Sequence, residues 1–159
     1  MNHKLGDSSI SLTQSQQDID SVEIYLVEEH GVDVIFGDDE ANAYWKPNGH
    51  PCVSVNTNQR KRLQLYTILH EAGHVILRER EGYEILYPYG QREESKTISR
   101  RVDVLREEVA AWDEGEKLAQ RLGIYLDYNL WHNFHKKHLF EYIKWAYEPT
   151  TYGGEIGKP

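Results

Sequence analysis

The chain has 159 residues, 39% of them hydrophobic and 28% charged, and its net charge is −8 at pH 7. This length suffices for one hydrophobic core and is short for two, so we predict a single soluble domain over residues 1–159, with flexible ends at about 1–13 and 149–159. No stretch approaches the roughly 18 apolar residues that a membrane helix needs, and the acidic balance disfavours binding to nucleic-acid phosphates.

Two features favour a cytoplasmic location. Residues 1–13 are polar and lack the apolar centre of a signal peptide. The single cysteine, Cys52, has no partner for an internal disulfide, and its place in a predicted strand indicates a packing role. We therefore expect the protein to work in the cytoplasm.

The first half of the chain predicts one helix followed by a small sheet. Apolar residues recur at near-helical spacing over 13–30, and Gly31 ends this helix. Three short β-branched or aromatic runs follow at 32–36, 41–46 and 52–56, with turn residues between them. Because a turn separates each run from the next, we expect the strands to pair as a mainly antiparallel sheet.

The second half predicts three further helices, over 58–81, 97–122 and 128–147, and a glycine follows each of the first two. Residues 83–96 contain three tyrosines, a proline and a glycine, which is typical of a long loop. The predicted fold class is therefore α+β. A small antiparallel three-stranded sheet would pack against the helix over 58–81, with about three other helices around it.

The most informative segment is His70-Glu71-Ala72-Gly73-His74, an H-E-x-x-H sequence within the helix expected over 58–81. Positions i and i+4 of a helix lie on one face, so both imidazoles can reach one Zn²⁺ at about 2.0–2.1 Å. Glu71 is angled so that its carboxylate can reach a metal-bound water and take its proton as general base. The pattern predicts metal-dependent hydrolysis.

The surrounding residues favour a real metal site over a chance occurrence of the H-E-x-x-H sequence. They are mostly apolar and indicate a largely buried helix, in which two histidines and a glutamate need partners. Gly73 costs about 1 kcal/mol in a helix interior, so it indicates close packing against another element. The alternative without a metal is a pair of satisfied core histidines beside a surface glutamate.

A catalytic zinc site needs a third protein ligand, and the following helix offers Glu107 and Glu108. Helical spacing from Glu107 meets a mixed, charged face. The same spacing from Glu108 meets an apolar face, made of Val104, Leu105, Ala111, Trp112, Gly115, Ala119 and Leu122. Because an unpaired carboxylate on an apolar face is costly, Glu108 is the better ligand and Glu107 the alternative. The small residues Ala111 and Gly115 on that face would let the two helices approach closely.

A strand over 53–56, a basic helix start and the sequence Tyr66-Thr67-Ile68-Leu69-His70-Glu71-Ala72-Gly73-His74 together resemble the ImmA/IrrE-type metallopeptidases of bacteria and bacteriophages. These are minimal zincins of the gluzincin kind, with a third-ligand glutamate in a pattern like E-x-x-A, which Glu108-Val109-Ala110-Ala111 matches. The resemblance covers roughly residues 15–123. It implies a zinc peptidase that acts on a protein or peptide, in the host cytoplasm if the chain is of phage origin.

Family members often cleave a DNA-binding repressor. The phenylalanine–alanine ending usual after their third-ligand motif is replaced here by Trp112-Asp113-Glu114-Gly115. The fold and the metal site are therefore carried over from the resemblance, and the repressor substrate is not.

Other acidic and tyrosine side chains have two interpretations each. Asp113 or Glu107 would orient a ligand histidine, although a solvated helix charge is the preferred interpretation. Tyr83, Tyr87 or Tyr89 would donate a hydrogen bond to the oxyanion, or would pack at the lip of a substrate groove. None of the three is assigned as catalytic.

Three histidines on the last predicted helix, His132, His135 and His138, are spaced by three residues among aromatic side chains. They indicate a packing face. The alternative places His135 or His138 near the metal.

The sequence thus predicts a zinc metallopeptidase with His70, His74 and Glu108 as metal ligands and Glu71 as general base. A rival from another class is a metal-bearing regulatory or inhibitory protein that binds a partner and cuts nothing. That rival predicts a metal site sealed by side chains in place of an open groove. A third possibility, a structural helix without metal, predicts that a chelator leaves the melting temperature unchanged.

Overall fold

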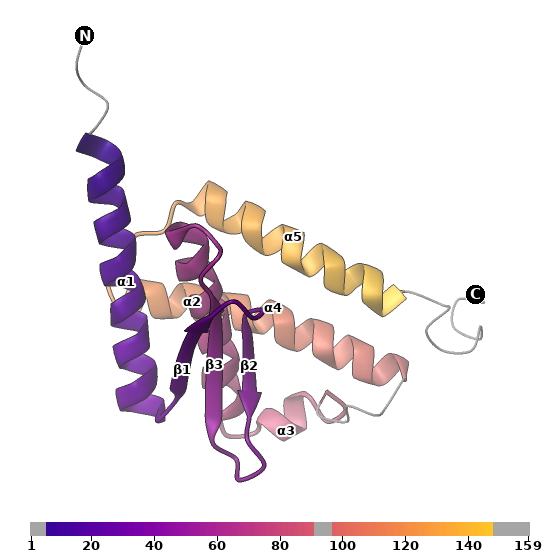
Figure 1. Cartoon of the computed structure of the whole chain (residues 1–159). Coiled ribbons are helices and arrows are strands. Elements are labelled where there is room, and N and C mark those ends of the chain that lie inside the picture. The colour runs from indigo at the N-terminus through magenta and orange to yellow at the C-terminus, as the bar shows by residue number, and fades with distance from the viewer. Residues whose placement is uncertain (1–5, 91–96, 148–159) are drawn as a thin grey trace.

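The computed structural model describes residues 6–90 and 97–147, with side chains from residue 14 onward. Its elements run in the order α1 (Gly6–His30), β1 (Asp33–Gly37), β2 (Asn42–Trp45), β3 (Pro51–Asn56), α2 (Lys61–Arg78), α3 (Tyr83–Leu86), α4 (Ile98–Arg121) and α5 (Tyr128–Tyr147). Figure 1 shows the sheet in front of α2, with α1 along one side and α5 running above α4. The predicted α+β class is confirmed.

Two predicted boundaries differ from the structure. The helix expected over 13–30 begins earlier, at Gly6. The predicted start was based on apolar periodicity, and the polar first turns of the helix do not show that pattern. The loop expected over 83–96 contains the short helix α3. The remainder of the two predicted flexible ends, residues 1–5 and 149–159, lies outside the described residues.

The sheet is mixed, which corrects the antiparallel prediction. In the described part of the chain the strand order is β1-β3-β2, and β3 pairs antiparallel with β2 but parallel with β1. The chain reverses at both predicted turns, but β3 inserts between the two earlier strands, so β1 and β3 point the same way. This order places the most buried strand at the centre, where Cys52, Val53 and Val55 are shielded from solvent.

The core surrounds α2, which contacts α1, β3 and α4. α1 contributes Ile19, Val22 and Leu26, spaced by three and four residues, so that one stripe of the helix is fully buried. α5 is attached mainly through Trp131, whose ring packs edge-on against Tyr66 and Trp112 at centroid distances of 5.2 and 5.1 Å. The core thus packs α2 against the sheet.

Two glycines allow α2 and α4 to pack with their backbones almost in contact. A Cβ atom at Gly73 would lie 2.0 Å from the carbonyl oxygen of Ala111, and one at Gly115 would lie 2.6 Å from that of Leu69. The close packing predicted from Gly73, Ala111 and Gly115 is therefore present. Because of this close packing, side chains on α4 reach the face of α2 that carries the H-E-x-x-H residues.

The described helices include none with the length and hydropathy needed to cross a membrane.

Candidate metal centre

The H-E-x-x-H segment lies within α2, and helical geometry brings its polar side chains together. Potential ligand atoms of His70, Glu71 and His74 lie within 4.8 Å of one another. His70 and His74 sit one turn apart, with side chains only 9% and 12% exposed. Since buried imidazoles and carboxylates need partners, this cluster is a candidate for binding a cation.

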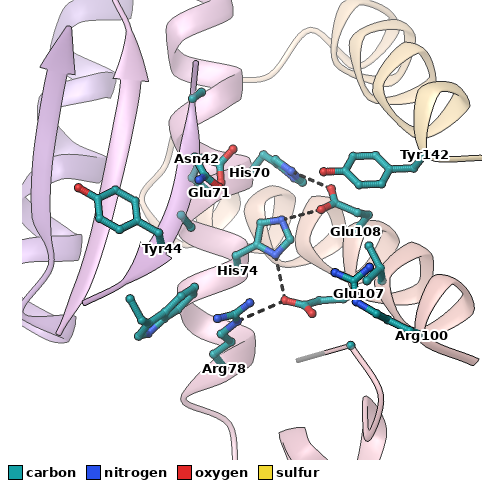
Figure 2. Close-up of a pocket in the computed structure, with 15 residues that line it drawn as sticks. Asn42, Tyr44, His70, Glu71, His74, Arg78, Arg100, Glu107, Glu108 and Tyr142 are labelled. Atoms are coloured by element: carbon teal, nitrogen blue, oxygen red, sulfur yellow. Dashed lines mark hydrogen bonds and ion pairs between the residues drawn. The ribbon is translucent and has the colours of Figure 1, made fainter. Parts of the chain in front are cut away.

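Glu108 reaches both histidines from α4. Its Oε2 lies 3.2 Å from His70 Nε2, and its Oε1 lies 3.3 Å from His74 Nε2 (Figure 2). Its side chain is 8% exposed. The predicted proximity of Glu108 to the motif is thus present, and it follows from the close packing of α2 on α4 at Gly73 and Gly115.

These separations fit a metal ion. Around a tetrahedral zinc with bonds of about 2.0–2.1 Å, neighbouring ligand atoms lie about 3.3–3.4 Å apart. The contacts of 3.2 and 3.3 Å between Glu108 and the two imidazoles match this spacing. Glu108 Oε2 is also buried, and its contact with His70 Nε2 lacks the geometry of a hydrogen bond among the described residues. Two imidazole nitrogens and one carboxylate are a donor set that suits zinc and leaves a coordination position open.

Glu107 supports His74 from the other side. Its Oε1 lies 3.2 Å from His74 Nδ1, and Tyr83 donates a hydrogen bond of 2.7 Å to its Oε2. Arg78 adds an ion pair at 3.6 Å. A carboxylate on the second nitrogen of a ligating histidine orients the ring and strengthens it as a ligand.

The preferred sequence interpretation of Glu107 as a solvated charge is therefore wrong. Its side chain is only 7% exposed, because the Tyr83 phenol and the Arg78 guanidinium cover it. Asp113, the other residue considered for this role, is exposed. Helical spacing did not reveal the cover over Glu107, because α3 and the end of α2 provide it.

The cluster favours a positive charge even without a metal. Burial on its own would lower the pKa of His74, but hydrogen bonds to Glu107 and Glu108 outweigh that effect and raise the pKa to about 10. Burial would raise the pKa of Glu108, and its contacts with His70 and His74 lower it well below the usual range. The metal-free cluster therefore holds a proton on His74 at neutral pH.

We expect zinc binding to displace that proton. With the pKa of metal-free His74 at about 10, the apparent affinity for zinc should rise about tenfold per pH unit between roughly pH 6 and 9. Calorimetric titration at pH 7.5, in two buffers of different ionisation enthalpy, should detect release of about one proton per zinc bound. Zinc binding without proton release would show that His74 is neutral in the metal-free protein.

α5 closes one side of the cluster. Tyr142 points its hydroxyl toward Glu108 (Figure 2), and burial and the Glu108 carboxylate raise the pKa of this phenol. The phenol therefore stays protonated and able to donate a hydrogen bond. Tyr142 is one of the aromatic side chains that the sequence analysis groups with the histidines of α5 as a packing face, although its position one turn after His138 was a usable signal.

The other predicted aromatic positions have structural partners. Trp112 stacks on the ring of His70 at 4.2 Å and on that of His135 at 5.0 Å. His135 therefore packs behind a candidate ligand, as the packing interpretation of this histidine expects. His138 lies 5.6 Å from the Trp112 ring. Tyr83, one of the three tyrosines considered for the oxyanion, contacts Glu107 instead.

A cavity of about 570 Å³ lies against the cluster. Its walls come from β2, α2, α4 and α5, and its lining includes His70, Glu71, His74 and Glu108. No hydrogen bond or ion pair engages the Glu71 carboxylate among the residues that the structure describes. The cluster thus has a space beside it that can accept a ligand.

The comparisons with known proteins agree with this geometry. Residues 27–125, from the end of α1 to just beyond α4, match the model of the IrrE N-terminal-like domain, Peptidase_M78. The chain belongs to this family. No curated protein and no solved structure matched the chain. The Peptidase_M78 match includes the motif and Glu108 and ends before α5, so Tyr142 lies outside it.

Proposed function

We propose that this Peptidase_M78 member is a zinc-dependent metallopeptidase of the gluzincin type, acting on a protein or peptide. The observation that carries the proposal is the contact of one Glu108 carboxylate with the Nε2 atoms of both motif histidines. His70, His74 and Glu108 would hold the zinc. When bound there, zinc supplies a Lewis acid that polarises a carbonyl group and acidifies water.

Glu71 lies as close to the two histidines as a third metal ligand would. Its assignment as general base therefore needs an argument beyond proximity. Glu108 contacts both imidazole Nε2 atoms, whereas no ion pair links Glu71 to any described residue. Glu71 is therefore available to the cavity. It would accept a proton from the attacking water and deliver it to the leaving amine.

The rival function, a metal-bearing protein that binds a partner without cutting it, predicts a sealed site. The cavity of about 570 Å³ beside the cluster favours the peptidase. A peptide is preferred over other acyl substrates because of the family to which the chain belongs.

The test compares zinc content and peptide cleavage in wild-type protein and Glu71→Gln. We expect both proteins to bind about one zinc per chain. Cleavage of a peptide library, measured by mass spectrometry, should be roughly 10²–10⁴-fold slower in Glu71→Gln than in wild type. Glu29→Gln, the same change at an exposed position of α1, is the matched control and should cleave normally. Equal cleavage by Glu71→Gln would remove Glu71 from the mechanism. Zinc binding with no cleavage of any peptide by wild type would favour the partner-binding rival.

A further inference from the structure

Arg100 lines the same cavity as the metal cluster. It lies on α4 one turn before Val104 and two turns before Glu107 and Glu108, and all four side chains line the cavity. Figure 2 shows Arg100 beside Glu107, on the α4 wall of the cavity. No part of the proposed reaction uses this residue.

The guanidinium of Arg100 has no acidic partner among the described residues. Its Nε is buried and makes no hydrogen bond there, and the contact found is with the ring of Trp145, at 5.8 Å. The nearest acid along α4, Asp103, is already paired with Arg106 and accepts a hydrogen bond from the Tyr89 backbone N–H. The next two acids are also engaged, Glu107 by His74 and Tyr83, and Glu108 by the two motif histidines. A partly buried charge without a partner is costly, which makes Arg100 ready to pair with an incoming anion.

The neighbouring arginine has a different task. Arg101 is 1% exposed and donates a 2.6 Å hydrogen bond to the carbonyl of Ala146 near the end of α5. Arg101 therefore holds α5 in place, whereas Arg100 faces the cavity.

The charges lining the cavity also favour binding of an anion by Arg100. The lining includes three carboxylates, Glu71, Glu107 and Glu108, and two guanidinium groups, Arg78 and Arg100. With a divalent ion bound and the histidines neutral, one positive charge remains in excess. Arg78 is paired with Glu107 and stacked on Trp45 at 3.8 Å, so the excess resides at Arg100. Inside a cavity such a charge attracts an anionic group more strongly than it would in water.

We propose that Arg100 is a specificity residue that binds a carboxylate of the substrate near the scissile bond. The carboxylate belongs to an aspartate or glutamate side chain or to the C-terminus of the peptide, and an arginine can hold either through two parallel hydrogen bonds. This inference rests on the proposed peptidase function and adds the substrate class to it.

The test uses peptide hydroxamates, which bind a zinc ion without being cut. In one series the peptide extends from the amino side of the chelating group, and in the other from the carboxyl side. Each series carries either Asp or Asn next to the chelating group. Where a series has a peptide C-terminus, that terminus is either free or amidated. Affinity for the zinc-loaded protein is measured by calorimetry in wild type, Arg100→Gln and Arg121→Gln. Arg121→Gln is the same change at an exposed site on α4.

We expect wild type and Arg121→Gln to bind one carboxylate probe at least about tenfold more tightly than its neutral analogue, and Arg100→Gln to lose that preference. Whether the Asp side chain or the free C-terminus carries the preference identifies the source of the carboxylate. Equal binding of the neutral probes by wild type and Arg100→Gln shows that the site of the variant is intact.

Two results would overturn the inference while leaving the peptidase proposal standing. One is equal affinity of wild type for charged and neutral probes, and the other is a preference that survives in Arg100→Gln. Failure of every probe, neutral ones included, to bind the zinc-loaded protein would overturn the proposed function and this inference with it.

Discussion

Glu108→Gln should bind zinc nearly a thousandfold more weakly than wild type. The variant keeps the shape of the side chain but removes the negative charge of the carboxylate, whose two oxygens contact His70 and His74 at 3.2 and 3.3 Å. Structural zinc sites in zinc-finger peptides bind with apparent free energies of about 10–16 kcal/mol, which corresponds to about 4 kcal/mol for each ligand lost. Competition with a chromophoric chelator at fixed pH measures the change.

Glu107→Gln is the matched control, because the two residues are adjacent and equally buried, at 5% and 6% exposure. Glu107 acts on the metal only through His74, so its loss should weaken binding roughly 10- to 100-fold. If Glu107→Gln lost more zinc affinity than Glu108→Gln, then Glu107 would be the metal ligand and Glu108 the supporting residue. A chelator should lower the Tm of wild-type protein and leave that of Glu108→Gln nearly unchanged.

Gly73→Ala should destabilise the protein and weaken zinc binding together. The added Cβ would lie 2.0 Å from the carbonyl oxygen of Ala111 and 2.8 Å from its carbon, both backbone atoms that no rotamer change can move. The helices must separate, which costs about 3 kcal/mol or more, while the better helix propensity of alanine returns only about 1 kcal/mol. Since Glu108 lies on α4 and the histidines on α2, the same separation draws the ligands apart.

Urea denaturation of the metal-free protein measures the loss of stability, and chelator competition measures the loss of zinc affinity. Gly37→Ala is the control, since a Cβ at Gly37 meets nothing within 4 Å. It should change the free energy of unfolding by less than about 1 kcal/mol. If Gly73→Ala matched wild type in both measurements, the close contact between α2 and α4 would not be what positions Glu108.

Both predictions depend on one property of the fold. The candidate ligands come from two helices, and their relative position is set by backbone contact at Gly73 and Gly115. Stability and metal binding are therefore coupled, and zinc bound only by the folded chain should stabilise it by mass action.

The sequence by itself determined what depends on regular local geometry. The i and i+4 spacing puts His70 and His74 on one face of α2 in any fold that keeps the helix. The period of α4 placed Glu108 on its apolar stripe, and the structure finds it against both histidines. Gly73 and Gly115 signalled a close approach, because glycine inside a helix is unfavourable unless the missing side chain is needed. The Peptidase_M78 match also follows from the sequence, and it confirms the predicted family resemblance.

Only the tertiary structure decided which segments lie next to one another. β3 enters the sheet between β1 and β2, and no local pattern distinguishes that order from a simple antiparallel one. Glu107 is a partner of His74 because Tyr83 and Arg78 cover it, and Tyr142 and Arg100 line the cavity because α5 folds back along α4. Such contacts join residues far apart in the chain, and periodicity along one helix shows which face is apolar without showing what covers it.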